Sequence, residues 1–355
     1  MPMKTKLVIL ILLLLTLTIP YFSGCIQEKS EDKIYDFIVD DDFTNETDGF
    51  NIDSFKNLSA AISEASDNIS IYVKNGRYNE SISIDKILII HGENANKTIL
   101  DGGNRSEDVI HVEGNGRVEL SGFTITNGGI QGKDDEDAAG IDLRSDENVI
   151  IGNIIANNIC GIYGRYSDNN IITKNLFYQN SEYGSYMYLS CDNINFSENI
   201  FSENQCALRL KGSKNCHVYF NAFVNNSEGL YLCCGAKYNL MYGNMFCGSD
   251  EWDAYDKDDN RWDLGSIPSS WNHHLNSFDN KLDNNSIGNF WDSFYLEEQN
   301  AFDNNSNGII DKTYDIPNTT YDDNHPLTVP AQIDNPFKKH LGVSSFCFSL
   351  TDNRK

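Results

Sequence analysis

The sequence lacks the features that would place this protein on a nucleic acid or within a membrane. Its 355 residues include 27 Lys and Arg against 52 Asp and Glu, which gives a formal net charge of −25 at pH 7. Because a nucleic-acid backbone would be repelled by such a chain, nucleic acid is excluded as a partner. Beyond the first 25 residues, no apolar run is long enough for a transmembrane helix. The rest of the chain is therefore expected to form one folded domain.

The first residues have the pattern of an export signal. Lys4 and Lys6 precede an apolar run, Leu7 to Ile19, that is short for a membrane span. The run closes on Phe22-Ser23-Gly24-Cys25, where small residues stand immediately before a cysteine. This arrangement resembles the site at which a prokaryotic lipoprotein is cleaved and lipidated. The alternative is an ordinary signal peptide followed by a chance cysteine.

These observations predict an exported protein held at a membrane by its lipid. Residues 1–24 would be the signal peptide, Cys25 the lipidated residue and 25–34 a short polar tether. The expected location is the cell surface or periplasm of a prokaryote, either an archaeon or a bacterium.

A repeat of 22 to 24 residues occupies the middle of the chain. An asparagine followed by two apolar residues recurs at steps of 22, 24, 22 and 23 residues, in Asn153-Ile-Ile, Asn175-Leu-Phe, Asn199-Ile-Phe, Asn221-Ala-Phe and Asn244-Met-Phe. A second asparagine follows five positions later in four of these repeats, at Asn158, Asn180, Asn204 and Asn226. Asparagine tolerates the left-handed backbone of sharp turns, and its amide can bond to the same amide one coil away. The pattern predicts an all-β fold, a single-stranded right-handed parallel β-helix.

The ends of this solenoid need caps, because an open end exposes the core. Apolar residues at helical spacing between Ser54 and Ala65 predict an N-terminal capping helix. The cap and first coils are assigned to residues 35–110, the repeats to 111–292 and a C-terminal segment to 293–355. Asp250 to Trp271 is interpreted as an inserted loop.

Two further stretches carry a family resemblance. The N-terminal run, from Phe55 to Ile84 and then Ile99-Leu-Asp-Gly102, is similar to the opening of pectin-lyase-like parallel β-helices. The C-terminal order resembles the ending of NosD-like exported proteins in that superfamily, with Asn260-Arg-Trp-Asp263, Gly288-Asn-Phe-Trp-Asp292, Asp303 to Asp311, Tyr314-Asp-Ile316 and Asn324-His-Pro-Leu327. The resemblance implies a β-helix and leaves its activity open. Family members are linked to copper or sulfur delivery during nitrous-oxide reductase maturation, and related repeats to carbohydrate binding or hydrolysis.

An outward stripe is predicted on the strand that follows each second ladder. If Ile141, Ile162 and Leu208 point inward, the residues after them point outward, because side chains alternate along a strand. The stripe is rich in tyrosine and basic residues, and its candidate carbohydrate-binding residues are Tyr163, Arg165, Tyr186, Tyr188, Arg209, Lys211 and Tyr231. Tyrosine rings can stack on sugars and guanidinium groups can bind carboxylates. The alternative is that tyrosine suits an exposed sheet and the bases offset surrounding acid.

A calcium loop is predicted in the C-terminal segment. Oxygen ligands at alternate positions, a glycine at Gly308 and a carboxylate in the ninth place match the start of an EF-hand loop. The candidate ligands are Asp303, Asn305, Asn307, Ile309 and Asp311. The glutamate expected in the twelfth place is missing, since Tyr314 stands there. The alternative is an Asx-rich turn without a metal.

Copper is the less favoured metal. Soft donors gather in a few coils, at Cys191, Cys216, His217, Cys233, Cys234, Met241, Met245 and Cys247, and copper(I) prefers such ligands. The more common role of such residues is that of small buried hydrophobes. Cys191 and Cys216 could also form a disulfide across one coil, and spacing alone leaves the cysteine state open.

The favoured function is a non-catalytic surface or periplasmic module that binds a polysaccharide or glycoconjugate, with an acidic glycan as the expected ligand. A polysaccharide lyase or hydrolase is the alternative, with Arg209 or Lys211 near an abstracted proton. A copper-handling maturation factor is the third hypothesis. No oligomeric state follows from the pattern.

Overall fold

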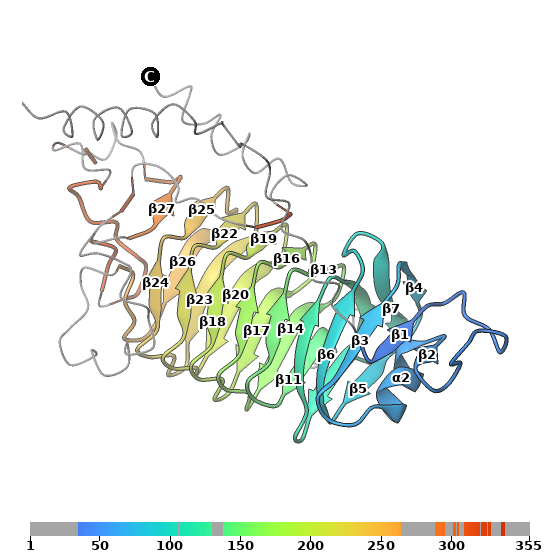
Figure 1. Cartoon of the computed structure of the whole chain (residues 1–355). Coiled ribbons are helices and arrows are strands. Elements are labelled where there is room, and N and C mark those ends of the chain that lie inside the picture. The colour runs from blue at the N-terminus through green and yellow to red at the C-terminus, as the bar shows by residue number, and fades with distance from the viewer. Residues whose placement is uncertain are drawn as a thin grey trace, which may run out of the picture. The chain divides into compact units, whose positions relative to one another are not determined.

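Three long parallel sheets form the wall of a β-helix in the computed structural model (Figure 1). The structure describes residues 35–105, 107–129, 138–263, 288–294, 301–302, 304, 309–319, 321–324, 326–327 and 335–337. Each sheet is parallel throughout, and from Ile69 to Asp256 successive strands belong to the three sheets in turn. The arrangement confirms the predicted all-β parallel β-helix.

The sheets are named A, B and C here. Sheet A has ten strands in the order β2 (Ser54–Phe55), β1 (Phe37–Val39), β3 (Ile69–Val73), β6 (Ile87–Gly92), β9 (Arg117–Ser121), β12 (Val149–Ile151), β15 (Ile171–Thr173), β18 (Asn195–Ser197), β21 (His217–Tyr219) and β24 (Leu240–Tyr242). Sheet B has nine, in the order β27 (Phe290–Trp291), β25 (Met245–Cys247), β22 (Ala222–Val224), β19 (Ile200–Ser202), β16 (Leu176–Tyr178), β13 (Ile154–Ala156), β10 (Thr124–Gly128), β7 (Thr98–Arg105) and β4 (Gly76–Tyr78). Sheet C has eight, in the order β26 (Trp252–Asp256), β23 (Glu228–Cys233), β20 (Cys206–Lys211), β17 (Tyr183–Tyr188), β14 (Cys160–Arg165), β11 (Ala139–Arg144), β8 (Ile110–Glu113) and β5 (Ile82–Ile84).

Both predicted asparagine ladders form at the corners between sheets. In the first, each side-chain amide donates to the next asparagine's Oδ1, at 3.2 Å from Asn153 to Asn175 and at 3.1 Å from Asn175 to Asn199. The same Oδ1 atoms also accept the backbone N–H of the preceding coil's asparagine. The second ladder repeats this pattern from Asn158 to Asn180 at 3.2 Å. The ladders therefore satisfy buried polar groups in the turns of every coil they cross.

The prediction that the ladder asparagines adopt the left-handed backbone is wrong. The left-handed residue at each corner is the one before the ladder asparagine, such as Lys174 (φ 56°) or Gln179 (φ 53°), and not the ladder asparagine itself. The ladder asparagines are buried, and their side-chain amides form hydrogen bonds between coils. Their role is bonding rather than backbone freedom.

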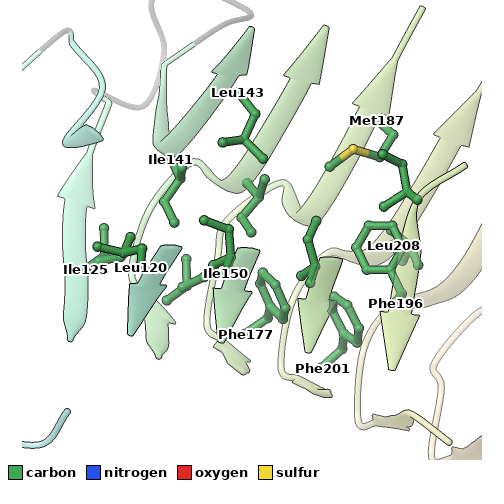
Figure 2. Close-up of a cluster of buried hydrophobic side chains, with 14 of the residues drawn as sticks. Leu120, Ile125, Ile141, Leu143, Ile150, Phe177, Met187, Phe196, Phe201 and Leu208 are labelled. Atoms are coloured by element: carbon green, nitrogen blue, oxygen red, sulfur yellow. The ribbon is translucent and has the colours of Figure 1, made fainter. Parts of the chain in front are cut away.

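A stack of aromatic rings fills the interior behind sheet B. Phe177 and Phe201 lie nearly parallel with ring centroids 4.4 Å apart, and Phe223, Phe246 and Trp291 continue the stack at 5.1, 4.7 and 4.4 Å. Figure 2 shows the start of this stack beside aliphatic side chains from the other two sheets. Neighbouring parallel strands about 4.8 Å apart hold the rings near their favourable stacking distance.

The predicted capping helix is present but shorter than expected. Helix α2 spans Leu58–Glu64, because Asn57 caps it and Ser54–Phe55 forms strand β2. The Glu80 carboxylate accepts the N–H groups of Leu58 and Ser59, both at 2.9 Å. At the other end, the Lys86 ammonium donates to three backbone carbonyls, those of Ile62, Ser63 and Ala65. The N–H and C=O groups that a helix leaves unpaired at its ends thus find hydrogen-bond partners in the first coils.

The C-terminal motifs close the other end. Asn289 continues the first ladder, and Asp323 receives both the backbone N–H of Asn289 at 2.7 Å and the indole N–H of Trp291 at 2.8 Å. Asp256 likewise accepts from Asn260 and from the indole of Trp262. These motifs therefore supply buried partners for the last coils.

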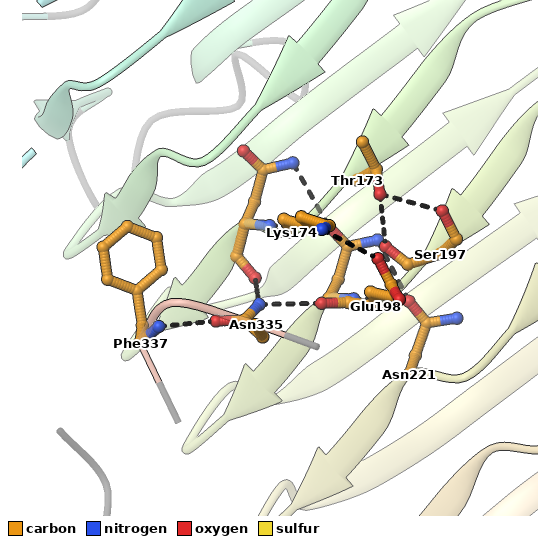
Figure 3. Close-up of polar contacts among 9 residues, drawn as sticks. Thr173, Lys174, Ser197, Glu198, Asn221, Asn335 and Phe337 are labelled. Atoms are coloured by element: carbon orange, nitrogen blue, oxygen red, sulfur yellow. Dashed lines mark hydrogen bonds and ion pairs between the residues drawn. The ribbon is translucent and has the colours of Figure 1, made fainter. Parts of the chain in front are cut away.

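A C-terminal stretch lies on the outward face of sheet B. The Asn335 side chain donates to the carbonyls of Asn175 at 3.1 Å and Glu198 at 2.7 Å, and accepts the N–H of Phe337 (Figure 3). Phe337 is 4% exposed and packs in an apolar cluster with Leu176 and other outward residues of sheet B. Among the described residues, no helix is long and apolar enough to span a membrane.

Candidate functional site on the outward face of sheet C

Outward side chains of sheet C form columns in register from coil to coil. The central column, defined by strand pairing, contains Ser83, His111, Asp142, Tyr163, Tyr186, Arg209, Tyr231 and Tyr255. A second column contains, from β14 onward, Arg165, Tyr188, Lys211 and Cys233. All seven candidate carbohydrate-binding residues lie in these two columns, on the face that the alternation predicted.

Arg209 is surrounded by tyrosine rings. Its guanidinium carbon lies 4.9 Å from the ring centroid of Tyr231, 5.0 Å from that of Tyr186 and 5.8 Å from that of Tyr183. It also donates a 2.9 Å hydrogen bond to the Tyr183 hydroxyl. These contacts fix the orientation of a side chain that would otherwise have many rotamers.

The other two cations of the stripe are held in the same way. The Arg165 guanidinium lies 5.5 Å from the Tyr163 ring and 5.3 Å from the Tyr188 ring, and donates to the Tyr163 hydroxyl at 2.9 Å. The Lys211 ammonium lies 4.5 Å from the Tyr188 ring. Tyr163 is only 2% exposed and packs in a small cluster separate from the interior core, so it supports the other rings from beneath.

The charge states of this face are fixed around neutral pH. Burial raises the pKa of Tyr186 and Tyr183, so both remain neutral phenols. Against the lowering effect of burial, interactions with the same two tyrosines raise the pKa of Arg209. The face therefore presents a charged Arg209 between neutral aromatic rings.

The stripe is one coil longer than the sequence indicated. The segment interpreted as an inserted loop contributes strand β26, which pairs with β23 and brings Tyr255 against Tyr231. The Lys257 ammonium lies 5.2 Å from the Tyr255 ring and 5.6 Å from the Tyr231 ring. This coil was missed because no repeat of the Asn-apolar-apolar pattern follows it at the usual step. The available signal was Tyr255, which follows an apolar residue, Ala254, as Tyr231 follows Leu230.

The other end of the central column carries an acidic cluster around one histidine. His111 Nδ1 lies 2.8 Å from Asp142 Oδ2 and 3.4 Å from Asp108 Oδ2, while its Nε2 lies 3.3 Å from Glu113 Oε2. Burial, followed by the charge of Asp142, raises the pKa of Asp108 to about 7, and burial also raises the pKa of Asp142. The candidate residues named from sequence do not include this cluster.

The soft donors named for copper do not meet at one point. Cys191, Cys216 and Met241 are buried in the interior core, and Met245 lies in the apolar cluster on sheet B. Cys247 is disulfide-bonded, and the other described cysteines are free, so a Cys191–Cys216 disulfide is not formed. Cys233 and Cys234 remain as an adjacent pair with their Sγ atoms 3.0 Å apart.

Most of the predicted calcium loop lies outside the described residues, and so does Cys25. Of the five candidate ligands, Asp303, Asn305 and Asn307 fall in that group. Asp311 Oδ2 accepts the backbone N–H of Asn304 at 2.8 Å and its side-chain amide at 3.0 Å, and Ile309 forms an isolated antiparallel bridge with Leu327. Calcium binding stays a prediction.

Three solved structures of low sequence identity are similar to this chain. A protein of Geobacillus virus E2 is 15% identical with a TM-score of 0.47, and the match covers 57% of this chain and 47% of that protein, so this chain spans about half of its length. A pectin methylesterase in complex with a hexasaccharide is 13% identical with a TM-score of 0.32, covering 66% of this chain and 91% of the enzyme. The A-module of the mannuronan C-5 epimerase AlgE4 of Azotobacter vinelandii is 11% identical with a TM-score of 0.33, covering 55% and 78%. No curated protein matches the sequence.

The family model described as "Periplasmic copper-binding protein (NosD)" matches residues 62–296. The described thiols and thioethers do not fit a shared copper(I) site, because they are dispersed between the core, sheet B and the end of strand β23. The cluster of Asp108, His111 and Asp142 offers nitrogen and oxygen donors instead, which suit a divalent ion such as copper(II). The match spans about two thirds of the sequence and every coil that forms sheet C, and this chain therefore belongs to the NosD family.

Proposed function

We propose that this protein binds an acidic polysaccharide across the outward face of sheet C. The observation that carries the proposal is a row of cations held against tyrosine rings across three consecutive coils, with Arg165 on β14 and with Arg209 and Lys211 on β20. These cations stand on a chain whose net charge is −25, so they are a local exception to its overall charge.

The arrangement matches the chemistry of a uronic acid polymer. Tyrosine rings stack on the apolar faces of sugars, and guanidinium groups bind carboxylates through paired hydrogen bonds. Because coils repeat along the solenoid, a glycan lying parallel to its axis would meet a tyrosine or an arginine of the central column at each coil from β14 to β26. Residues already oriented by their neighbours lose little further entropy on binding.

The same geometry favours binding over chemistry. Abstraction of a proton needs a base whose pKa lies near the working pH. The raised pKa values of Arg209 and Tyr186 keep the first charged and the second protonated at neutral pH, and neither form accepts a proton. Elimination of a uronic acid polymer is therefore the less supported function of this face.

Affinity electrophoresis through gels containing polygalacturonate or alginate tests the proposal. The wild type should be retarded, and Arg209→Ala should weaken binding about 30-fold, the effect of losing one charge-assisted contact of about 2 kcal/mol. Arg117→Ala is the matched control, because Arg117 is a half-exposed arginine on sheet A. Equal retardation of wild type and Arg209→Ala would contradict the proposal, as would equal retention in a gel containing a neutral glucan.

Incubation with the same polymers tests the alternative of a lyase. We expect no increase in ultraviolet absorbance from unsaturated products. A steady increase that Arg209→Ala abolishes would replace the binding proposal with a catalytic one.

We also propose that the protein is exported and anchored through a lipid on Cys25. The support is the apolar run followed by small residues and a cysteine. Mass spectrometry of membrane-extracted protein should find a lipidated N-terminal Cys25, and Cys25→Ala should release the protein from membranes. Recovery of the wild type wholly outside the membrane fraction would contradict this.

A further inference from the structure

We propose that Asp108, His111 and Asp142 bind a divalent transition-metal ion of the Zn²⁺ and Cu²⁺ class at the end of the central column. The three side chains come from two neighbouring coils of sheet C, and their ligand atoms all lie within 4.8 Å of one another. The site is separate from the tyrosine and cation contacts of the glycan proposal and does not depend on it.

The distances suit a small four-coordinate ion. Donors that each lie about 2.0 to 2.1 Å from such an ion are separated by roughly 3.3 Å. The observed separations from His111 Nδ1 are 2.8 Å to Asp142 Oδ2 and 3.4 Å to Asp108 Oδ2. A shift of a few tenths of an ångström would admit the ion, and a fourth position would remain for water or an anionic ligand.

A second observation that points to a bound cation is a buried oxygen of Asp142 that lacks a hydrogen-bond partner. The Asp142 side chain is fully buried, at 0% exposure, and its Oδ1 has no hydrogen-bond partner. The other oxygen, Oδ2, is shared by Arg144 Nε at 2.7 Å and by His111. A buried carboxylate oxygen without a partner is costly, and a cation bound through both oxygens of Asp142 would satisfy it.

The second nitrogen of the imidazole is placed as metal-bound histidines require. His111 Nε2 lies 3.3 Å from the Glu113 carboxylate, on the side of the ring opposite Nδ1. A proton on Nε2 that faces Glu113 leaves Nδ1 as the lone-pair donor toward the two aspartates. Such carboxylate–histidine pairs orient the ligating ring and increase its basicity.

The donor set selects the class of ion. One imidazole and two carboxylates suit borderline divalent ions such as Zn²⁺ and Cu²⁺. Calcium takes six to eight oxygen ligands, so the single nitrogen and few oxygens here disfavour it. Without a metal, the same contacts would join His111 directly to its acidic neighbours, and the experiment distinguishes these two states.

Calorimetric titration of the chelator-treated, untagged protein with Zn²⁺ tests the proposal. We expect one ion per chain for the wild type and a loss of affinity of at least about 100-fold in His111→Gln and Asp142→Asn. Glu113→Gln should weaken binding about 10-fold, the lower end of the range for outer-sphere partners. Because the Glu113 side chain is 55% exposed, this variant should fold normally even if the buried ones do not.

Asp41→Asn is the matched control, since Asp40, Asp41 and Asp42 form the other acidic group that could hold an ion among the described residues. It should leave the affinity unchanged. Electron paramagnetic resonance of the Cu²⁺-loaded protein should show a single coupled nitrogen that His111→Gln removes. Failure of the wild type to bind, unchanged affinity in His111→Gln and Glu113→Gln, or loss of the site in a Cys233→Ser/Cys234→Ser variant would overturn the proposal.

Discussion

The outward faces of sheets B and C stand on the same coils but have opposite chemistry. On sheet B the outward residues are apolar and buried, and Phe337 from the C-terminal stretch packs among them. On sheet C, from β14 onward, they are mostly tyrosines and cations. Several remain partly exposed, Tyr163 is buried beneath them, and Arg209 is held by three rings. A large apolar face must be covered, whereas aromatic–cation contacts tolerate water. The comparison assigns sheet B to stability, and it is the basis on which we propose ligand binding for sheet C.

The largest expected effect concerns the cover of sheet B. Phe337→Ala removes a 4% exposed ring and should lower the free energy of unfolding by about 3 kcal/mol. Its retardation in polygalacturonate gels should stay at the wild-type value. Denaturant titration measures the free energy of unfolding. A change below about 1 kcal/mol would show that the outward face of sheet B does not depend on Phe337 for stability.

Acidification should separate stability from recognition. Burial lowers the pKa of His217, on sheet A, to about 4 from its ordinary 6.5. Because the folded pKa is lower, the unfolded state binds more protons between these values, so this contribution is complete above pH 6.5 and is lost as the pH falls to 4. The loss should reach about 3 kcal/mol. The raised pKa of Arg209 keeps it charged throughout this window, so glycan retardation should persist while the protein remains folded.

The difference between wild type and His217→Asn isolates this effect from the titrating carboxylates. Denaturant titrations at pH 7 and pH 4.5 should show that the variant loses less stability than the wild type. Equal losses would show that His217 is not the group responsible.

Loss of a shared ring should have a moderate effect on one face only. Tyr188 lies under both Arg165 and Lys211, so Tyr188→Ala should weaken glycan binding about 10-fold, or about 1.4 kcal/mol. Tyr178→Ala, on the outward side of sheet B, is the matched control and should not change binding. Equal effects of the two variants in the gel assay would remove the distinction between the faces.

The smallest expected effect comes from Glu228, an acidic residue near Arg209 on sheet C. Glu228 lies on strand β23 and interacts with Arg209, lowering the local positive charge. Glu228→Gln should increase affinity for polygalacturonate about two- to fourfold. The gain should disappear at high salt, because the effect is electrostatic. A decrease in affinity would mean that Glu228 itself contacts the ligand.

A third asparagine ladder, which is interrupted, could not be predicted from the repeat. Asn148 bonds to Asn170, and Asn239 bonds to Asn260, at a corner of the helix where the coils between them carry Ile194 and Cys216. Because the interruption breaks the repeat, only the two continuous ladders were recognised from sequence. The corner tolerates Ile194 and Cys216 in place of asparagine, because backbone hydrogen bonds between neighbouring coils continue across it.

The sequence by itself determined the solenoid, its two continuous ladders and the outward positions of Tyr163, Arg209 and Tyr231, because a fixed period with alternating faces repeats the same environment at each step. Only the tertiary structure decided that Asp108 and His111 lie beside Asp142. No ladder asparagine marks the coil of β8, and residues 114–138 separate the two strands, so their register could not be counted along the chain. Pairing of β8 with β11 set that register, and with it brought one imidazole and two carboxylates to a common point.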